Sequence, residues 1–267
     1  MDDEPDWRTY DAVAEVYARV FEPRMELPAA DLVTEAGIEP GMRALDVGTG
    51  TGVVARVAAK AAAPDGIVVG VDRSFPMLRV ARARGGAYAM AEAIDLPFRD
   101  ETFDVVLSSF VLSHFRRYDT ALFDMLRVLK RGGRMAVATW GPSLDDFQKA
   151  WRDVCEEFAE REILADAVAR AVPWEERFQD AIRLKDTLHE AGVRDMIVDR
   201  REYRFQMTVE DYLAGREVAA SGRFLREMFG DAGWERLRVR AREVFAQRFQ
   251  PTFNDFRDVN LVVGTKP

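Results

Sequence analysis

The glycine-rich stretch at residues 44–52 constrains this chain more than any other feature. It reads Ala-Leu-Asp-Val-Gly-Thr-Gly-Thr-Gly and joins an apolar segment, residues 43–47, to a helical pattern, residues 51–63. Glycine accepts positive φ and lets a ligand approach the backbone where a Cβ would clash. A glycine-rich turn between a strand and a helix predicts an α/β fold that binds a nucleotide.

The rest of the first half alternates short apolar runs with amphipathic patterns, which predicts a doubly wound, mostly parallel sheet covered by helices. We expect strands at 43–47, 67–71, 87–90, 103–109 and 134–139, with helices at 51–63, 75–84 and 119–130. Ser74 can cap the second of these helices, and Gly85-Gly86 can end it.

The pattern changes after Trp140. We expect a long helical stretch at 144–170, a helix at 183–191, a strand at 194–207, more helix to about 248 and a final strand at 258–265. This divides the chain into an α/β core at 1–140 and strands within 183–207 and 251–267 that complete a seven-stranded sheet. Helical insertions at 141–182 and 208–250 either form a lid over the crevice at the carboxyl ends of the strands or merely cover the sheet.

Composition limits the classes of partner, the metal sites and the cellular location that we expect. The formal net charge of −8 disfavours a nucleic acid, because a phosphate backbone needs a basic surface. A single cysteine, Cys155, and two histidines, His114 and His189, leave no disulfide and no metal site to expect. The acidic residues 1–6 do not resemble a signal peptide, and no apolar run suits a membrane span. We therefore expect a cytoplasmic protein.

Asp46 separates two interpretations of the glycine turn. Residues 50–55 also satisfy the Gly-x-Gly-x-x-Gly/Ala pattern of dinucleotide-binding folds, so an NAD(P)-dependent oxidoreductase is an alternative. A carboxylate two residues before Gly48 would repel a pyrophosphate, whereas it would attract the sulfonium and ammonium of S-adenosylmethionine. The chain also lacks the Tyr-x-x-x-Lys pair of many dehydrogenases.

The sequence resembles the class I S-adenosylmethionine-dependent methyltransferases, especially the ubiquinone/menaquinone-biosynthesis (methyltransferase type 11) branch. The resemblance covers about residues 7–140 closely, with a weaker similarity at 183–207 and at the carboxyl end. The segments that carry it are 45–52, 71–74, 91–98, 103–110 and 129–134. It implies the Rossmann-like methyltransferase fold.

The resemblance also implies which residues contact the cofactor. Asp46 and the glycines surround its methionine portion, Asp72 binds the ribose hydroxyls, and Met77 lies beside the adenine. Glu92 stands where the family usually has Asp, so its side-chain contact departs from the pattern. Tyr17 belongs to a segment that resembles a covering helix, or packs in a helix interface. The full set is Tyr17, Asp46, Gly48, Thr49, Gly50, Gly52, Asp72, Arg73, Met77, Glu92, Ala93 and Ser109.

Methyl transfer is an in-line displacement that needs alignment more than acid–base help. His114, just past the fourth strand, is our candidate catalytic base bordering the acceptor; the alternative is a packed or solvated histidine. His189 is expected at the surface. Aromatic residues in the insertions either form core or favour a flat, hydrophobic acceptor: Phe147, Trp151, Phe158, Trp174, Phe178 and Tyr212.

The sequence thus predicts a methyltransferase that moves a methyl group from S-adenosylmethionine to an O, N or C nucleophile of a small molecule and releases S-adenosylhomocysteine. A nucleic-acid or protein methyltransferase is a rival, although residues 108–111 lack the Asn/Asp/Ser-Pro-Pro-aromatic motif of amino-methylating enzymes. A non-catalytic S-adenosylmethionine-binding protein is another rival. We expect a monomer or homodimer.

Overall fold

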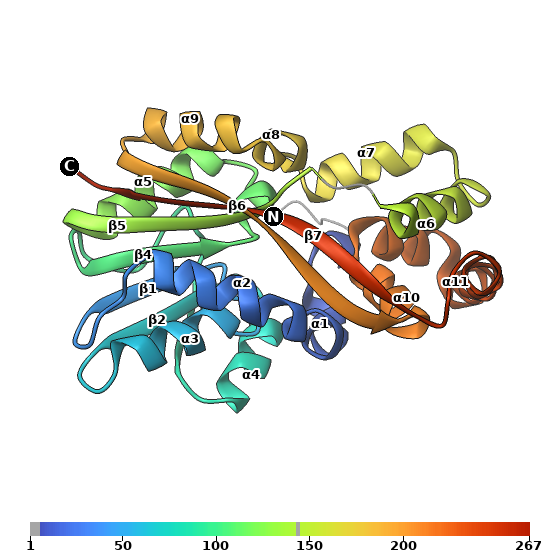
Figure 1. Ribbon diagram of the computed structural model, residues 1–267, viewed down its shortest axis with the longest axis horizontal. Coiled ribbons are helices and arrows are strands. Elements are labelled where there is room, and N and C mark those ends of the chain that lie inside the picture. The colour runs from blue at the N-terminus through green and yellow to red at the C-terminus, as the bar shows by residue number, and fades with distance from the viewer. Residues whose placement is uncertain (1–5, 143–144) are drawn as a thin grey trace.

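The computed structural model describes residues 6–142 and 145–267 and contains a seven-stranded sheet (Figure 1). Its order is β3-β2-β1-β4-β5-β7-β6; β1 to β5 pair in parallel, and β7 runs antiparallel to both its neighbours. The predicted doubly wound, mostly parallel fold is therefore confirmed. The strands are β1 (Arg43–Val47), β2 (Ile67–Asp72), β3 (Ala87–Met90), β4 (Phe103–Ser109), β5 (Leu129–Trp140), β6 (Arg194–Thr208) and β7 (Thr252–Thr265).

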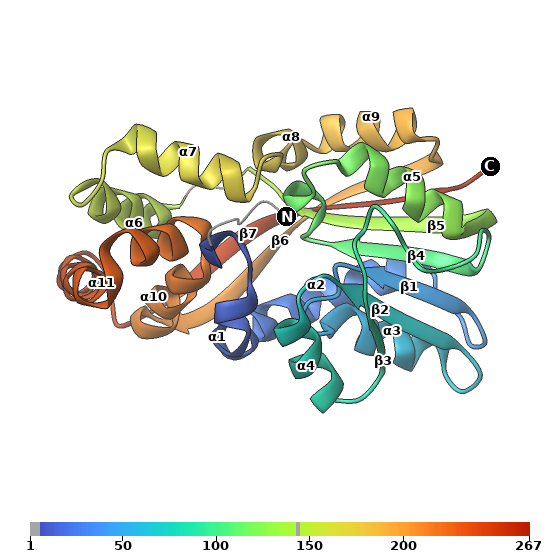
Figure 2. The ribbon, with the colours of Figure 1, turned by 180° about the vertical axis from the view of Figure 1, so that it is seen from behind.

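Helices cover both faces of the sheet (Figure 2). On one face, α2 (Glu22–Glu35) and α3 (Val53–Ala62) pack against β1, β4 and β5 through a cluster that includes Leu32 and Val54. On the other, α5 (Tyr118–Val128), α8 (Glu175–Gln179) and α9 (Ala181–Ala191) join a second cluster. Helix α4 (Phe75–Ala83) begins at the Ser74 cap, as predicted, and packs beside β2 and β3.

A helical part lies beyond the carboxyl ends of the parallel strands (Figure 1). It consists of α6 (Asp146–Glu156), α7 (Arg161–Ala171), α10 (Val209–Val218) and α11 (Ala220–Arg248), which share an apolar cluster of their own. The single helix predicted at 144–170 is two helices, and Leu144 lies outside the described residues. The chain turns between them, so that Phe158 and Leu164 can both pack on the shared cluster.

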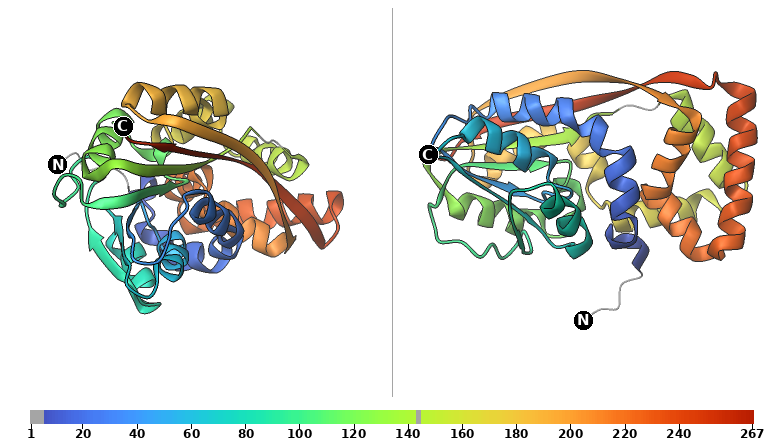
Figure 3. Two further views of the ribbon diagram at one scale, coloured as in Figure 1. Left: turned by 60° about the vertical axis from the view of Figure 1, so that its left-hand side comes forward. Right: turned by 90° about the horizontal axis from the view of Figure 1, so that it is seen from below.

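The β6–β7 hairpin links the sheet to the helical part (Figure 3). Its ladder runs from the pair Arg194–Thr265 to the pair Thr208–Thr252. Strand β7 begins at Thr252 and not at the predicted Asp258, because the far half of the hairpin packs on the helical cluster through Met207 and Phe253.

The N-terminal segment lies between the sheet and the helical part (Figure 3). It contains two short 3-10 turns, η1 (Asp6–Arg8) and η2 (Asp11–Val13), followed by α1 (Ala14–Val20). Trp7 packs edge-on against Phe224 of α11, with ring centroids 5.2 Å apart, and contacts the apolar face of α7. Among the described residues no helix is long and apolar enough to span a membrane.

Candidate functional site

A cavity of about 530 Å³ opens where the carboxyl ends of β1, β2, β3 and β4 meet the N-terminal segment and α7. Its volume falls in the range of small-molecule sites, about 300–1,000 Å³. Ten of the thirteen predicted site residues line it: Tyr17, Gly48, Gly50, Asp72, Arg73, Met77, Glu92, Ala93, Ser109 and His114. Asp46, Thr49 and Gly52 do not.

The glycine turn forms the floor of this cavity because its backbone is left-handed. Gly48 has φ 74° and Gly50 has φ 54°, values that residues other than glycine rarely adopt. A Cβ on Gly48 would lie 2.6 Å from the side chain of Val111, which also lines the cavity. A Cβ on Gly52 would collide with the Tyr88 ring and hydroxyl on the far side of the turn.

Asp46 stabilises the turn through hydrogen bonds and does not line the cavity. One oxygen of its buried carboxylate accepts hydrogen bonds from the Thr49 hydroxyl, at 2.6 Å, and from the Ala55 backbone N–H, at 3.1 Å. Burial raises the pKa of Asp46 to about 7, although both hydrogen bonds oppose the shift. Asp46 thus supports the turn, and its contact with the methionine portion, which the resemblance implied, stays a prediction.

Asp72 sits at the end of β2 and connects the turn to α4. Its Oδ2 accepts from the Gly50 N–H at 2.8 Å, and its Oδ1 accepts from the Ser74 N–H at 2.9 Å. Burial raises the pKa of this carboxyl, and the two backbone hydrogen bonds oppose the shift. Each carboxylate oxygen can accept a further hydrogen bond. Asp72 thus presents a paired acceptor to the cavity from a fixed position.

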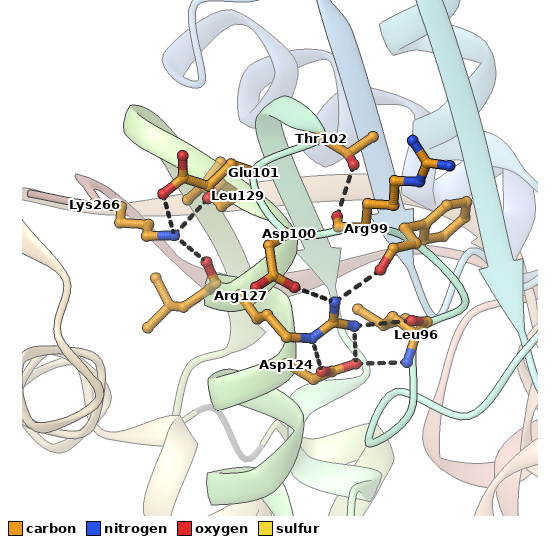
Figure 4. Close-up of polar contacts among 11 residues, drawn as sticks. Leu96, Arg99, Asp100, Glu101, Thr102, Asp124, Arg127, Leu129 and Lys266 are labelled. Atoms are coloured by element: carbon orange, nitrogen blue, oxygen red, sulfur yellow. Dashed lines mark hydrogen bonds and ion pairs between the residues drawn. The ribbon is translucent and has the colours of Figure 1, made fainter.

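The segment after β3 is fixed by an ionic network around Arg127 of α5 (Figure 4). The Arg127 guanidinium donates hydrogen bonds to the carboxylates of Asp124, at 2.6 Å, and Asp100, at 2.9 Å. It also donates to the Leu96 and Phe98 carbonyls. Asp124 in turn accepts from the Leu96 N–H at 2.5 Å. This network anchors the far end of a loop whose residues 91–94 line the cavity.

Glu92 lies at the rim of the cavity. Its carboxylate is 3.7 Å from the Arg73 guanidinium, and both side chains are more than half exposed. Such an exposed pair contributes little to stability, on the order of 0–1 kcal/mol. Glu92 is therefore free to move toward a ligand.

The N-terminal segment roofs the cavity with tyrosine rings. Tyr17 stacks on Phe21 at 5.3 Å and meets Tyr10 edge-on at 5.7 Å. Burial raises the pKa of the Tyr17 hydroxyl well above its usual range, so the hydroxyl stays protonated. The Ser74 hydroxyl donates to Asp11 at 2.6 Å and ties this roof to the start of α4.

His114 ends the 3-10 turn η3 (Leu112–His114) and borders the cavity. Its ring meets Tyr10 edge-on at 5.7 Å. Burial first, and then the charge of Arg223, lower the pKa of His114 to about 4, although a hydrogen bond with the Ala171 backbone opposes them. The imidazole is therefore neutral near pH 7. His189 is exposed, as predicted.

Several lining residues carry no sequence motif that could have predicted them. Their place in the cavity depends on how the N-terminal segment and α7 fold against η3 and α5. They include Arg8, Asp11, Arg116, Arg117, Arg170 and Ala171.

The aromatic residues of the insertions are core. Four of the six aromatic residues named from the sequence pack in the helical part and two pack on the sheet cluster, so of the two alternatives for them the structure supports core. The aromatic lining comes instead from Tyr10, Tyr17, Phe110 and Phe115.

Comparisons with known proteins agree with this geometry. Residues 45–137 match the family model described as a methyltransferase domain. Over 125 residues the chain is 38% identical to the ubiquinone/menaquinone biosynthesis C-methyltransferase UbiE of Burkholderia orbicola, and over 111 residues it is 43% identical to that of Bordetella avium. The first match covers 45% of this chain and 51% of the relative, and the second covers 39% and 43%. The chain thus spans about half the length of these relatives.

Solved structures share the fold over nearly the whole chain. Haemonchus contortus phosphoethanolamine N-methyltransferase 2, in complex with phosphomonomethylethanolamine and S-adenosylhomocysteine, is 20% identical, with a TM-score of 0.61 over 97% of this chain and 58% of that one. An S-adenosylmethionine-dependent methyltransferase from Thermotoga maritima is 18% identical, with a TM-score of 0.58 over 98% and 100%.

Motif, fold and family match coincide on the segment that carries the glycine turn, Asp72 and the loop after β3. Residues 45–137 of this chain match the methyltransferase domain model, and the sheet that they help to build has the Rossmann-like fold of the solved methyltransferases.

Proposed function

We propose that this protein transfers a methyl group from S-adenosylmethionine to an O, N or C nucleophile of a small molecule. The observation that carries the proposal is the position of Asp72, whose two oxygens are held by the Gly50 and Ser74 amides at the cavity wall. A carboxylate there suits the two hydroxyls of a ribose, and the cavity has room for an adenosine and a second small molecule.

The chain's own residues would act by binding and alignment. Asp72 would hold the ribose, Met77 and Ala93 would contact the adenine, and Gly48 would let the ligand lie against the backbone. S-adenosylmethionine supplies an electrophilic methyl on sulfur; when the nucleophile forms its bond to that carbon, the carbon–sulfur bond breaks and a neutral thioether leaves. Correct alignment of the nucleophile contributes several kcal/mol.

His114 is the proposed proton acceptor where the nucleophile must lose a proton. Its imidazole is neutral because burial and Arg223 hold its pKa down to about 4. The ring borders the cavity next to Tyr10. A base whose pKa is this low suits an acceptor that is already acidic.

Calorimetry with S-adenosylhomocysteine and with NAD tests this function against an oxidoreductase. We expect S-adenosylhomocysteine to bind and NAD not to bind. Asp72→Asn should weaken S-adenosylhomocysteine binding by about tenfold or more, since a hydrogen bond to a charged group contributes about 1.5–3 kcal/mol. Asp186→Asn, on the exposed side of α9, is the control and should bind as the wild type does. Binding of NAD alone would contradict the proposal.

A further inference from the structure

The two ends of the cavity differ in charge. Three carboxylic acids and five arginines line it, in a chain whose overall charge is −8. The positive excess is therefore a local feature of this cavity. The acids are Asp11, Asp72 and Glu92, and the arginines are Arg8, Arg73, Arg116, Arg117 and Arg170.

The acids gather at the glycine turn. Asp72 accepts from the Gly50 amide, and Asp11 is bound to Ser74, two residues beyond Asp72. Glu92 is paired with Arg73, the one arginine that belongs to this end.

The remaining four arginines form what we call the basic wall: Arg8, Arg116, Arg117 and Arg170. Arg116 and Arg117 follow His114, whose ring is hydrogen-bonded to the Ala171 backbone, the residue after Arg170. Arg8 follows Trp7, which packs with Ala171 in one apolar cluster. Three segments far apart in the sequence thus bring their arginines to the same side of the cavity.

A fifth guanidinium lies behind this wall. Arg223 of α11 is buried, donates to the Trp7 carbonyl at 2.5 Å and lies over the Tyr10 ring, 4.4 Å from its centroid. Among the described residues its Nη2 has no hydrogen-bond partner. Its charge adds to the positive potential on the His114 side.

S-adenosylmethionine does not account for this charge. It carries two positive groups and one carboxylate at neutral pH, so its binding makes the cavity more positive. One arginine could pair with that carboxylate, which leaves Arg117 and Arg170 at the cavity for a second anion. Arg170 is 2.7 Å from Asp166, but this pair is more than half exposed and so is weak enough to rearrange.

We propose that the basic wall binds an anionic group, a carboxylate or a phosphate, carried by the methyl acceptor. Guanidinium groups bind both anions through paired hydrogen bonds. The acceptor would lie with its anion at Arg117 and Arg170 and its nucleophile toward the glycine turn, past His114. This inference rests on the proposed function and names the class of its second substrate.

The test is calorimetry on the full chain saturated with S-adenosylhomocysteine, so that the thioether's own carboxylate is already in place. The probes are phenyl phosphate, benzoate and neutral benzamide. We expect at least one anion to bind about tenfold or more tightly than benzamide, and the tighter anion identifies the group. Raising the salt concentration from about 50 to about 500 mM should weaken the binding of the anion and leave the binding of benzamide unchanged.

The double variant Arg117→Gln/Arg170→Gln, again measured at saturating S-adenosylhomocysteine, should lose the preference for the anion. The matched control, Arg131→Gln/Arg183→Gln, removes two exposed arginines outside the cavity and should keep the preference. Equal affinities, a preference for benzamide or no binding of either anion would overturn the inference. Failure of S-adenosylhomocysteine itself to bind would instead overturn the proposed function.

Discussion

The Ser74 hydroxyl donates a hydrogen bond of 2.6 Å to Asp11, and this contact joins the roof of the cavity to the start of α4. Ser74 also accepts from the Met77 N–H at 3.3 Å as the cap of α4, and its own N–H is bound to Asp72. The position of the N-terminal segment is thus linked to the carboxylate proposed to hold the ribose.

Loss of this link should loosen the roof. We expect Asp11→Ala to speed the dissociation of S-adenosylhomocysteine by up to about tenfold, since one hydrogen bond contributes about 0.5–1.5 kcal/mol. The α4 cap is left intact in this variant. Surface plasmon resonance measures the rate, and Asp65→Ala, in an exposed turn, is the control. An unchanged dissociation rate would show that the roof is held by other contacts.

Gly48→Ala should weaken binding of S-adenosylhomocysteine beyond its effect on stability. Gly48 and Gly132 have nearly equal φ values, 74° and 72°, so alanine at either position costs about 1–2 kcal/mol of backbone strain. Only at Gly48 does the new Cβ meet a neighbour, the Val111 side chain at 2.6 Å.

Calorimetry and thermal unfolding on both glycine variants separate the two effects. Gly132→Ala should lose stability and keep its affinity, because nothing lies within 4 Å of its new Cβ. Adding Val111→Ala to Gly48→Ala should recover part of the affinity. Equal affinity losses at Gly48 and Gly132 would contradict this account.

Arg127→Met should destabilise the protein by about 2 kcal/mol, because it leaves Asp124 and two backbone carbonyls without their donor. Burial alone would raise the pKa of Asp124, but the bonds from Arg127 and Leu96 outweigh it and hold that pKa below its usual range. A depressed pKa stabilises the fold above about pH 4, and this stabilisation disappears as the pH falls through the folded-state value.

Denaturant unfolding between about pH 2 and 7 should therefore show that the free energy of unfolding falls less toward acidic pH in Arg127→Met than in the wild type. The control, Arg131→Met, removes an exposed arginine that lies 3.4 Å from Glu101, and its stability should change by no more than about 0.5 kcal/mol. If the two variants were equally stable, the network of Figure 4 would not fix the loop.

His114→Gln should change how stability depends on pH. Because the folded protein holds the pKa of His114 down to about 4, the unfolded chain takes up the proton first as the pH falls from about 6.5. His114 thus contributes stability above about pH 6.5 that is lost toward pH 4, by up to about 3 kcal/mol. This part of the pH dependence should be absent in His114→Gln and present in His189→Gln, which changes an exposed histidine.

The same variant tests the proposed base. With a neutral His114, kcat/KM of the wild type should show no inflection near pH 6.5. His114→Gln should lower kcat/KM by about 10²-fold or more, the usual contribution of a general base. An unchanged kcat/KM across pH would remove His114 from the chemistry and leave it a packing residue.

Much of the sheet could be predicted because each parallel strand is a short apolar run with a readable boundary. Ser74 predicted the start of α4, and the glycine turn predicted the bend between β1 and α3. The end of the β6–β7 hairpin could not be predicted in this way. Its Asp255 and Arg257 are buried as an ion pair, so the alternation of polar and apolar residues that marks a strand is interrupted there.

The residues of the candidate site could likewise be predicted only in part. Residues on the glycine turn and at the ends of β2 to β4 could be located because they lie on local motifs. The basic wall could not, because Arg8, Arg117 and Arg170 line the same cavity only through the packing of Trp7 and α7 over long sequence distances. Asp46 could be placed on the turn, but its hydrogen bonds with Thr49 and Ala55 could not be predicted, because they depend on how the turn folds back onto α3.

A crystal structure grown with S-adenosylhomocysteine tests the central claim most directly. We predict density in the 530 Å³ cavity, with the ribose hydroxyls on Asp72, the adenine beside Met77 and the sulfur facing His114. An empty cavity at saturating ligand, or a diphosphate lying on the glycine turn, would contradict the account.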